Sequence, residues 1–265
     1  MCTLVLLLRP GHPVPVMLAA NRDERLDRPW DAPGAWWPDH PGVIGGRDRT
    51  GGGTWMGVNR HGVVAAVLNR PGSLGPAPGK RSRGELPLLA LAHPTAAAAI
   101  AAMAALDAGE WRSFNLVIAD WTGAGFLRGP GRGHVHAEPL PPGVSMVTAH
   151  DPNDLDSPRI ARHLPRFRAA PRPDTDDWAA WRAILSDRAG GPGEQMNVAH
   201  RGGFGTICSA LLALPRAGTP DWWFAPGPPD RADFAPVRFP AIANPPTSGA
   251  PGVGGGAQSE DPWPV

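Results

Sequence analysis

Cys2 and the polar quartet Asn21-Arg22-Asp23-Glu24 are the residues whose types and spacing suggest shared chemistry. Cys2 follows Met1, and a small second residue generally allows the initiator methionine to be removed. Removal leaves a thiol and a free α-amine on one residue, with reference pKa values of about 8.5 and about 7.7 to 8.0. The amine can then act as the base that activates its own side chain. We therefore expect an N-terminal nucleophile here; the alternative is a cysteine that merely begins a buried strand.

Two short apolar runs place the quartet beside the thiol. Residues 3–8 and 14–20 flank the turn-rich residues 9–13, a pattern that predicts two antiparallel strands. A turn centred in this segment sets Cys2 across from about Ala20, within about two positions. Cross-strand neighbours lie about 5 Å apart, so the quartet falls within reach of the thiol.

The quartet supplies what a nucleophilic thiol needs. An arginine next to the thiol, here Arg22, lowers its pKa and favours the thiolate. Asp23 or Asn21 can hold the ammonium group or the substrate. The polar quartet opposite Cys2 therefore supports the nucleophile and leaves the strand-forming cysteine as the open alternative.

Four segments in this order resemble the NRDE family, also called the transport and Golgi organisation protein two family. They are Met1-Cys2, Asn21-Arg22-Asp23-Glu24, Gly52-Gly53-Thr54-Trp55-Met56-Gly57-Val58-Asn59 and Leu68-Asn69. The resemblance implies an α+β fold, a four-layer αββα sandwich of two antiparallel sheets flanked by helices, as in N-terminal-nucleophile hydrolases. It covers residues 1–240 as a single domain, and we expect residues 241–265 to form a flexible tail rich in Pro and Gly.

The resemblance leaves two functions open. One is a cysteine amidohydrolase that cleaves an amide or acyl bond of a small substrate; the other is a non-catalytic protein that binds and traffics haem or acyl lipids. For the enzyme, the expected catalytic residues are Cys2, Arg22, Asp23 and Asn69. The expected ligand-binding residues are Asn21, Glu24, Trp55, Arg70 and His150. No cofactor is required, and haem is a candidate ligand only.

Two of these assignments have alternatives. Asn69 ends a predicted strand, where its amide can donate to an oxyanion or instead cap the loop that follows. Residues 155–159 match only partly a family stretch that looks functional, so either His150 or Asn153 is a candidate for the associated role.

Other signals predict the elements around these residues. Residues 25–42, rich in Pro and Trp, read as a long lid or as a plug for one end of the core. Residues 82–85 have capping-box spacing and predict a helix start, and Thr95 opens a second helix. Four short strands between residues 114 and 149 are expected to form the second sheet. Residues 204–214 read as a central strand containing Cys208, an inert buried thiol.

Composition excludes several classes of protein. The 265 residues fit one large domain, and the net charge of +1 without a basic tract argues against nucleic-acid binding. Two cysteines without Cys-x-x-Cys spacing predict neither a disulfide framework nor a metal site. Lys80 is the only lysine and tyrosine is absent, which suggests a GC-rich bacterial genome.

The location follows from what the sequence lacks. No segment has signal-peptide architecture, and no apolar run reaches the roughly 18 residues of a membrane span. We therefore expect a cytoplasmic protein, and its oligomeric state is not predicted.

Overall fold

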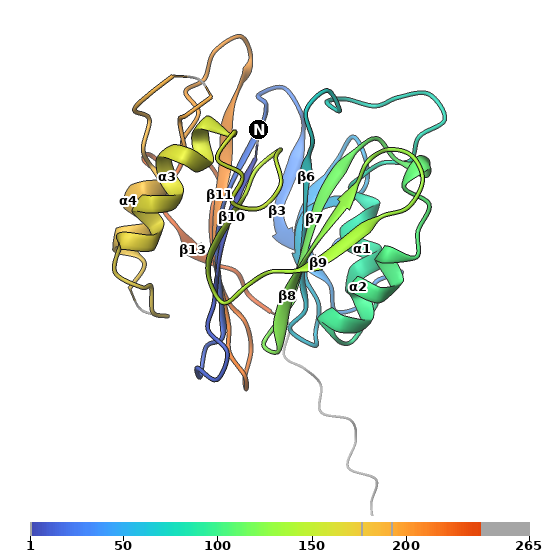
Figure 1. Cartoon of the computed structure of the whole chain (residues 1–265), viewed down its shortest axis with the longest axis horizontal. Coiled ribbons are helices and arrows are strands. Elements are labelled where there is room, and N and C mark those ends of the chain that lie inside the picture. The colour runs from blue at the N-terminus through green and yellow to red at the C-terminus, as the bar shows by residue number, and fades with distance from the viewer. Residues whose placement is uncertain (1, 176, 192, 240–265) are drawn as a thin grey trace, which may run out of the picture.

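The computed structural model describes residues 2–175, 177–191 and 193–239, and the predicted tail at 241–265 lies outside them. Two antiparallel sheets pack face to face, with helices on both outer sides (Figure 1). The expected α+β sandwich is therefore confirmed. Three apolar layers fill it, one between the sheets and one under each pair of helices.

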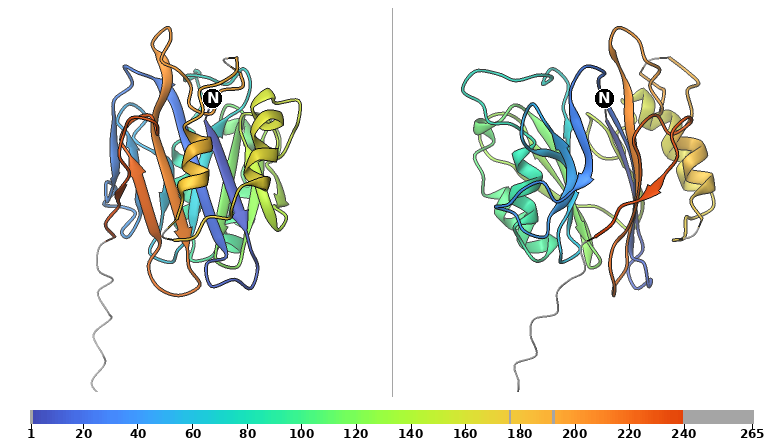
Figure 2. Two further views of the ribbon diagram at one scale, coloured as in Figure 1. Left: turned by 90° about the vertical axis from the view of Figure 1, so that its left-hand side faces the viewer. Right: turned by 180° about the vertical axis from the view of Figure 1, so that it is seen from behind.

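The first strand of the chain lies inside the first sheet and not at its edge. In spatial order it contains β10 (Gly143–Val147), β1 (Thr3–Leu8), β2 (Val16–Arg25), β11 (Phe204–Leu214), β12 (Asp221–Ala225) and β13 (Ala235–Pro236). The predicted hairpin is β1 and β2, and the predicted central strand is β11. Helices α3 (Pro158–Ala169) and α4 (Ala179–Leu185) cover the outer face of this sheet (Figures 1 and 2).

The second sheet is formed by consecutive strands. They are β3 (Trp30–Gly34), β4 (Ile44–Asp48), β5 (Thr54–Val58), β6 (Val64–Asn69), β7 (Phe114–Asp120), β8 (Gly123–Gly129) and β9 (His136–Pro139). Helices α1 (Glu85–Leu91) and α2 (Ala96–Ala104) cover its outer face, and a short 3-10 turn follows at Ala108–Glu110 (Figure 1). The longest described helix, α3, has 12 residues, and no helix in the described part is long and apolar enough to span a bilayer.

Three expectations about these elements need correction. The strand at 143–147 was expected in the second sheet, but β10 crosses over and pairs with the edge of β1 that β2 leaves open. The segment 25–42 contains strand β3, whose Trp30 packs edge-on against Trp55 and Phe224, each at 5.9 Å. Helix α1 has Gly84 as its N-cap without a side-chain hydrogen bond, so no capping box forms.

One irregularity in β11 affects the site. Asp23 of β2 pairs with Thr206, and Arg22 pairs with Cys208, so Ile207 is an extra residue in β11. Such a bulge changes which residues of a strand face a given side. As a result Thr206 and Ser209 both face the helices.

Candidate active site

Cys2 lies directly before β1 at one end of the sandwich. Thr3 pairs with Asn21, which sets Cys2 level with Arg22, two positions from the predicted partner Ala20. The Sγ atom donates to the backbone carbonyl of Asp23 at 3.6 Å. Burial raises the pKa of the Cys2 thiol, and the Asp23 carboxylate raises it further. The expected lowering by Arg22 is present but is outweighed.

The quartet is divided between the two faces of β2, because successive side chains of a strand point to opposite sides. Arg22 and Glu24 face the space between the sheets. Asn21 and Asp23 face helices α3 and α4. Of the four residues predicted to surround the thiol, only Arg22 and Glu24 therefore lie on the side of β2 that faces the second sheet.

Asp23 is held in the layer under α3. Its side chain is fully buried and accepts hydrogen bonds from Arg159 Nη1 at 2.9 Å and Thr206 Oγ1 at 2.6 Å. Arg159 also donates to Thr3 Oγ1 at 2.8 Å. Sequence reasoning missed Arg159 and Thr206. The partial family match at residues 155–159 was the available signal for Arg159.

The Asn21 amide is engaged by the fold. Its Nδ2 donates to the carbonyls of Leu185 and Met196 at 3.0 and 2.9 Å, and its Oδ1 accepts from Ser209 Oγ at 2.6 Å. The side chain points away from the space between the sheets. The Asn21 amide thus ties β2 to the end of α4 and the segment after it, while the residue also lines the inner pocket, and its predicted ligand contact stays a prediction.

Arg22 is the buried cation beside the thiol. Its side chain is 5% exposed, its guanidinium lies over the Trp55 ring at 3.9 Å, and its Nη2 lies 3.4 Å from Asp48 Oδ2. Asp48 also accepts from Arg28 Nε at 2.7 Å. Burial alone would raise the pKa of Asp48, but the bonds from Arg28 and from a backbone N–H lower it below its usual value. The Nη1 of Arg22 is buried and has no hydrogen-bond partner among the described residues.

Two pockets meet at these residues. An inner pocket of about 30 Å³ lies between the sheets and is lined mainly by apolar side chains. An outer cleft of about 390 Å³ opens from it toward the loops at 74–77 and 80–84. Cys2, Arg22 and Trp55 line both, so the thiol lies where they join.

The remaining predicted residues fall into two groups. Asn69 and Glu24 line the outer cleft with Cys2. Within the described part of the chain, the Asn69 side chain makes no hydrogen bond to the loop that follows, so its alternative capping role has no bond to support it. Arg70 and His150 line neither pocket.

Arg70, His150 and Asn153 contact partners outside the two pockets. Arg70 Nη1 donates to Asn115 Oδ1 at 2.6 Å and to Asp151 Oδ1 at 2.5 Å. His150 Nδ1 lies 3.3 Å from a carboxylate oxygen of residue 154. Asn153 adopts a positive φ of 59°, and its Oδ1 accepts from the backbone N–H of residue 146 at 2.9 Å. The structure therefore assigns these three side chains to the loop after β10.

Comparisons with known proteins point to the same fold. A family model described as Transport and Golgi organisation 2 matches residues 1–160, whereas no curated protein matches the sequence. The Caenorhabditis elegans ortholog of N-acylethanolamine-hydrolyzing acid amidase has a TM-score of 0.54 at 10% identity, covering 80% of this chain and 92% of that chain. This likeness shows that the two chains share a fold.

Two further solved structures have lower scores. Penicillin V acylase from Agrobacterium tumefaciens has a TM-score of 0.48 at 14% identity and covers 85% of this chain and 83% of its own. A mutant conjugated bile acid hydrolase from Clostridium perfringens has a TM-score of 0.48 at 10% identity and covers 91% and 97%.

Proposed function

The chain belongs to the Transport and Golgi organisation 2 family, and from this premise we propose that it is an N-terminal cysteine hydrolase that cleaves an amide or acyl bond of a small substrate. The observation that carries the proposal is the position of Cys2 and Arg22 at the junction of an apolar pocket and an open cleft. The fold shared with an amidase supports an amide as the bond class.

The α-amine of Cys2 is the proposed base, and it becomes free when Met1 is removed. It takes the proton of its own thiol, and the thiolate attacks the substrate carbonyl carbon. Such a base is needed because the raised thiol pKa makes the thiolate scarce at neutral pH. The proton then passes to the leaving amine as its bond to carbon breaks. Water hydrolyses the resulting thioester and restores the thiol.

Arg22 is the proposed partner of the negative oxygen formed in this attack. Leaving a buried donor unsatisfied costs about 1 to 3 kcal/mol, and the Nη1 of Arg22 is such a donor among the described residues. An oxyanion at the junction would be the missing acceptor. Because the oxyanion exists only in the transition state and the intermediate, the bond from Arg22 would stabilise those states. Asn69 is the proposed second donor, because it lines the outer cleft with Cys2.

The test has two stages. The intact mass of the protein from its native host shows whether Met1 is absent. A panel of acyl p-nitroanilides is then assayed with wild type, Cys2→Ser and Cys208→Ala. We expect turnover to need Cys2 but not Cys208. Retention of Met1 on essentially all molecules, or undiminished turnover by Cys2→Ser, would refute the proposed mechanism.

A carrier of haem or acyl lipids stays a prediction beside this proposal. Haem titrated into the wild-type protein would then give a saturable absorbance change. Absence of that change would remove the haem version of the carrier function.

A further inference from the structure

Positive charge is concentrated in the outer cleft. Its lining contains seven basic residues and two acidic residues, Glu24 and Asp48. Arg25 and Arg81 form ion pairs with carboxylates outside the lining. Five lining cations then face two lining carboxylates, although the whole chain has a net charge of only +1. The excess is therefore a property of this cleft and not of the overall composition.

Three of these cations, Lys80, Arg83 and Arg112, have no carboxylate within ion-pair distance in the part of the chain that the structure describes. They donate instead to neutral oxygens. Arg83 Nη1 donates to the carbonyl and hydroxyl of Ser73 at 2.5 and 2.7 Å, and Arg112 Nη1 donates to the carbonyl of Leu74 at 2.7 Å. These bonds hold the loop at the mouth of the cleft but neutralise no charge.

Arg83 is half-buried among like charges. Burial, together with the neighbouring Arg112 and Arg28, lowers the pKa of Arg83 to about 10. The group is still charged at neutral pH, in surroundings that disfavour the charge. The Glu24 carboxylate and the Cys2 thiolate act in the opposite direction on this pKa, and both residues line the same cleft as Arg83.

We propose that the substrate carries an anionic group, a carboxylate or a phosphate, which Arg83 and Arg112 bind in the outer cleft while the scissile carbonyl lies at Cys2. This inference rests on the proposed hydrolase function and adds the substrate class. Guanidinium groups bind both kinds of anion through paired hydrogen bonds. A bound anion also relieves the repulsion among the cations, and their field speeds its arrival.

The first experiment measures anion binding without turnover. Inorganic phosphate and glutarate are titrated separately into the full chain by calorimetry at low salt. We expect saturable binding that weakens with salt, and a loss of about tenfold or more in Arg83→Gln and Arg112→Gln, since a hydrogen bond to a charged group contributes about 1.5 to 3 kcal/mol. The anion that binds more tightly identifies the group.

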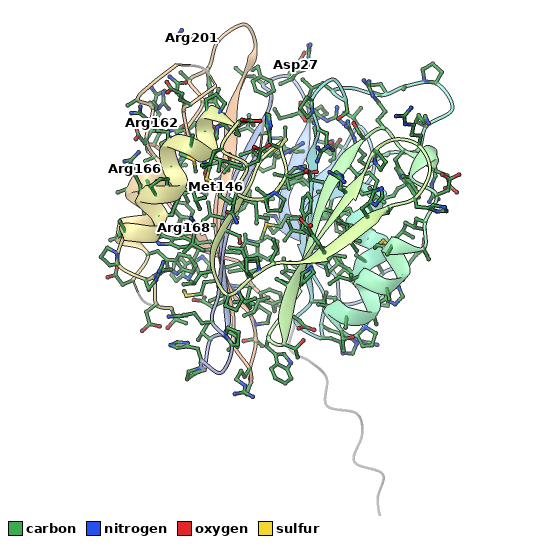
Figure 3. All side chains as sticks on the ribbon, in the orientation of Figure 1. Asp27, Met146, Arg162, Arg166, Arg168 and Arg201 are labelled. Carbon is green, nitrogen blue, oxygen red and sulfur yellow. The ribbon has the colours of Figure 1, made fainter. Side chains whose placement is uncertain are left out.

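The matched control is Arg162→Gln. Arg162 is exposed on α3, on the far side of the first sheet from the cleft (Figure 3). This variant loses the same charge and should bind both anions as wild type does. The proposal is overturned if neither anion binds saturably to wild type, or if the control weakens binding as much as Arg83→Gln.

A second measurement covers the case in which Arg83→Gln disturbs the loop. Iodoacetate and iodoacetamide have nearly the same size and differ in charge, so the ratio of their alkylation rates at Cys2 reports the potential in the cleft. We expect a lower ratio in Arg83→Gln than in wild type, and a ratio close to wild type in Arg83→Lys. A ratio that Arg83→Gln leaves unchanged contradicts the proposal.

These readouts separate the two proposals. Anion binding with no Cys2-dependent turnover would refute the hydrolase and leave an anion site. Cys2-dependent turnover without anion binding would leave the hydrolase and refute the substrate class.

Discussion

Asp23 and Arg159 form a buried ion pair, 2.9 Å from Oδ2 to Nη1, which joins strand β2 to helix α3. Their side chains are 0% and 4% exposed. The carboxylate therefore lies on the helix side of the sheet, while the backbone carbonyl of the same residue accepts from the Cys2 thiol. Asp23 thus connects the packing of α3 to the position of the Cys2 thiol.

Arg159→Met is expected to lower the free energy of unfolding by about 3 kcal/mol or more, because removing one partner of a buried ion pair leaves the other charge poorly compensated. Arg166→Met on the same helix is the control. Arg166 pairs with Asp187, but its side chain is 42% exposed, so its loss should cost about 1 kcal/mol or less. Urea unfolding measures both. Equal losses would contradict the role assigned to the Asp23 pair.

Removing Met1 is expected to speed the alkylation of Cys2 by iodoacetamide at pH 7 to 8. The thiol pKa is raised by burial. A free amine on the same residue would favour the thiolate, and the thiolate population rises about tenfold for each unit by which the thiol pKa falls. Peptide mass analysis before and after methionine aminopeptidase treatment measures the rate. Cys208 is the internal control and should not change. An unchanged rate at Cys2 would argue against the amine as its base.

Gly46→Ala is expected to disturb the cleft through Trp55. A Cβ at residue 46 would lie 2.2 Å from the Trp55 ring, so the ring must move, and Arg22 would lose the surface on which it lies. We expect a loss of about 1 to 3 kcal/mol in stability and an altered rate of Cys2 alkylation. Gly123→Ala is the control, because a Cβ there meets open space. Identical behaviour of the two variants would contradict this account.

Stability is expected to fall as the pH rises from about 9 toward 12. Burial raises the pKa of Cys208 from its ordinary 9.0 to about 12, so the folded state keeps a proton that the unfolded state releases in this range. The difference between folded and unfolded proton binding lowers the free energy of unfolding. The chain has no tyrosine and one lysine, but two other shifted groups titrate in this window: the Cys2 thiol, whose pKa is also raised, and Arg83, whose lowered pKa of about 10 acts on stability in the opposite direction.

The comparison that isolates this contribution is wild type against Cys208→Ala. Urea unfolding at pH 8 and at pH 11 should give a smaller loss of stability in the variant. The opposite result, an equal or larger loss in Cys208→Ala, would show that the buried thiol is not responsible.

Local signals in the sequence were enough to predict part of this molecule. The pattern of residues 3–20 predicted the hairpin, because apolar runs and a Gly/Pro turn act over short distances. The partners of Asp23 were not predictable in this way, since Arg159 and Thr206 lie 136 and 183 residues from it along the chain. Pairing across such distances depends on how whole layers pack.

The division of the quartet has a local cause. The predicted strand ended at residue 20, whereas β2 continues to Arg25, and strand alternation over these added residues turns Arg22 and Asp23 to opposite sides. Arg70 and His150 were placed at the site by resemblance and by nearness to strand ends. Their positions are fixed instead by contacts with Asp151 and Asp154 of the loop after β10.

The extra residue Ile207 sets a limit on changes of length in this part of the gene. Thr206 and Ser209 are three positions apart, yet they bond to Asp23 and Asn21 on one face of the sheet. A regular strand places residues two apart on the same side, so an in-frame deletion of codon 207 would leave Thr206 and Ser209 two positions apart and both still on the helix side. Deletion of codons 207 and 208 together would make them neighbours and turn one hydroxyl into the apolar space between the sheets, so β11 should tolerate the loss of one residue here far better than the loss of two.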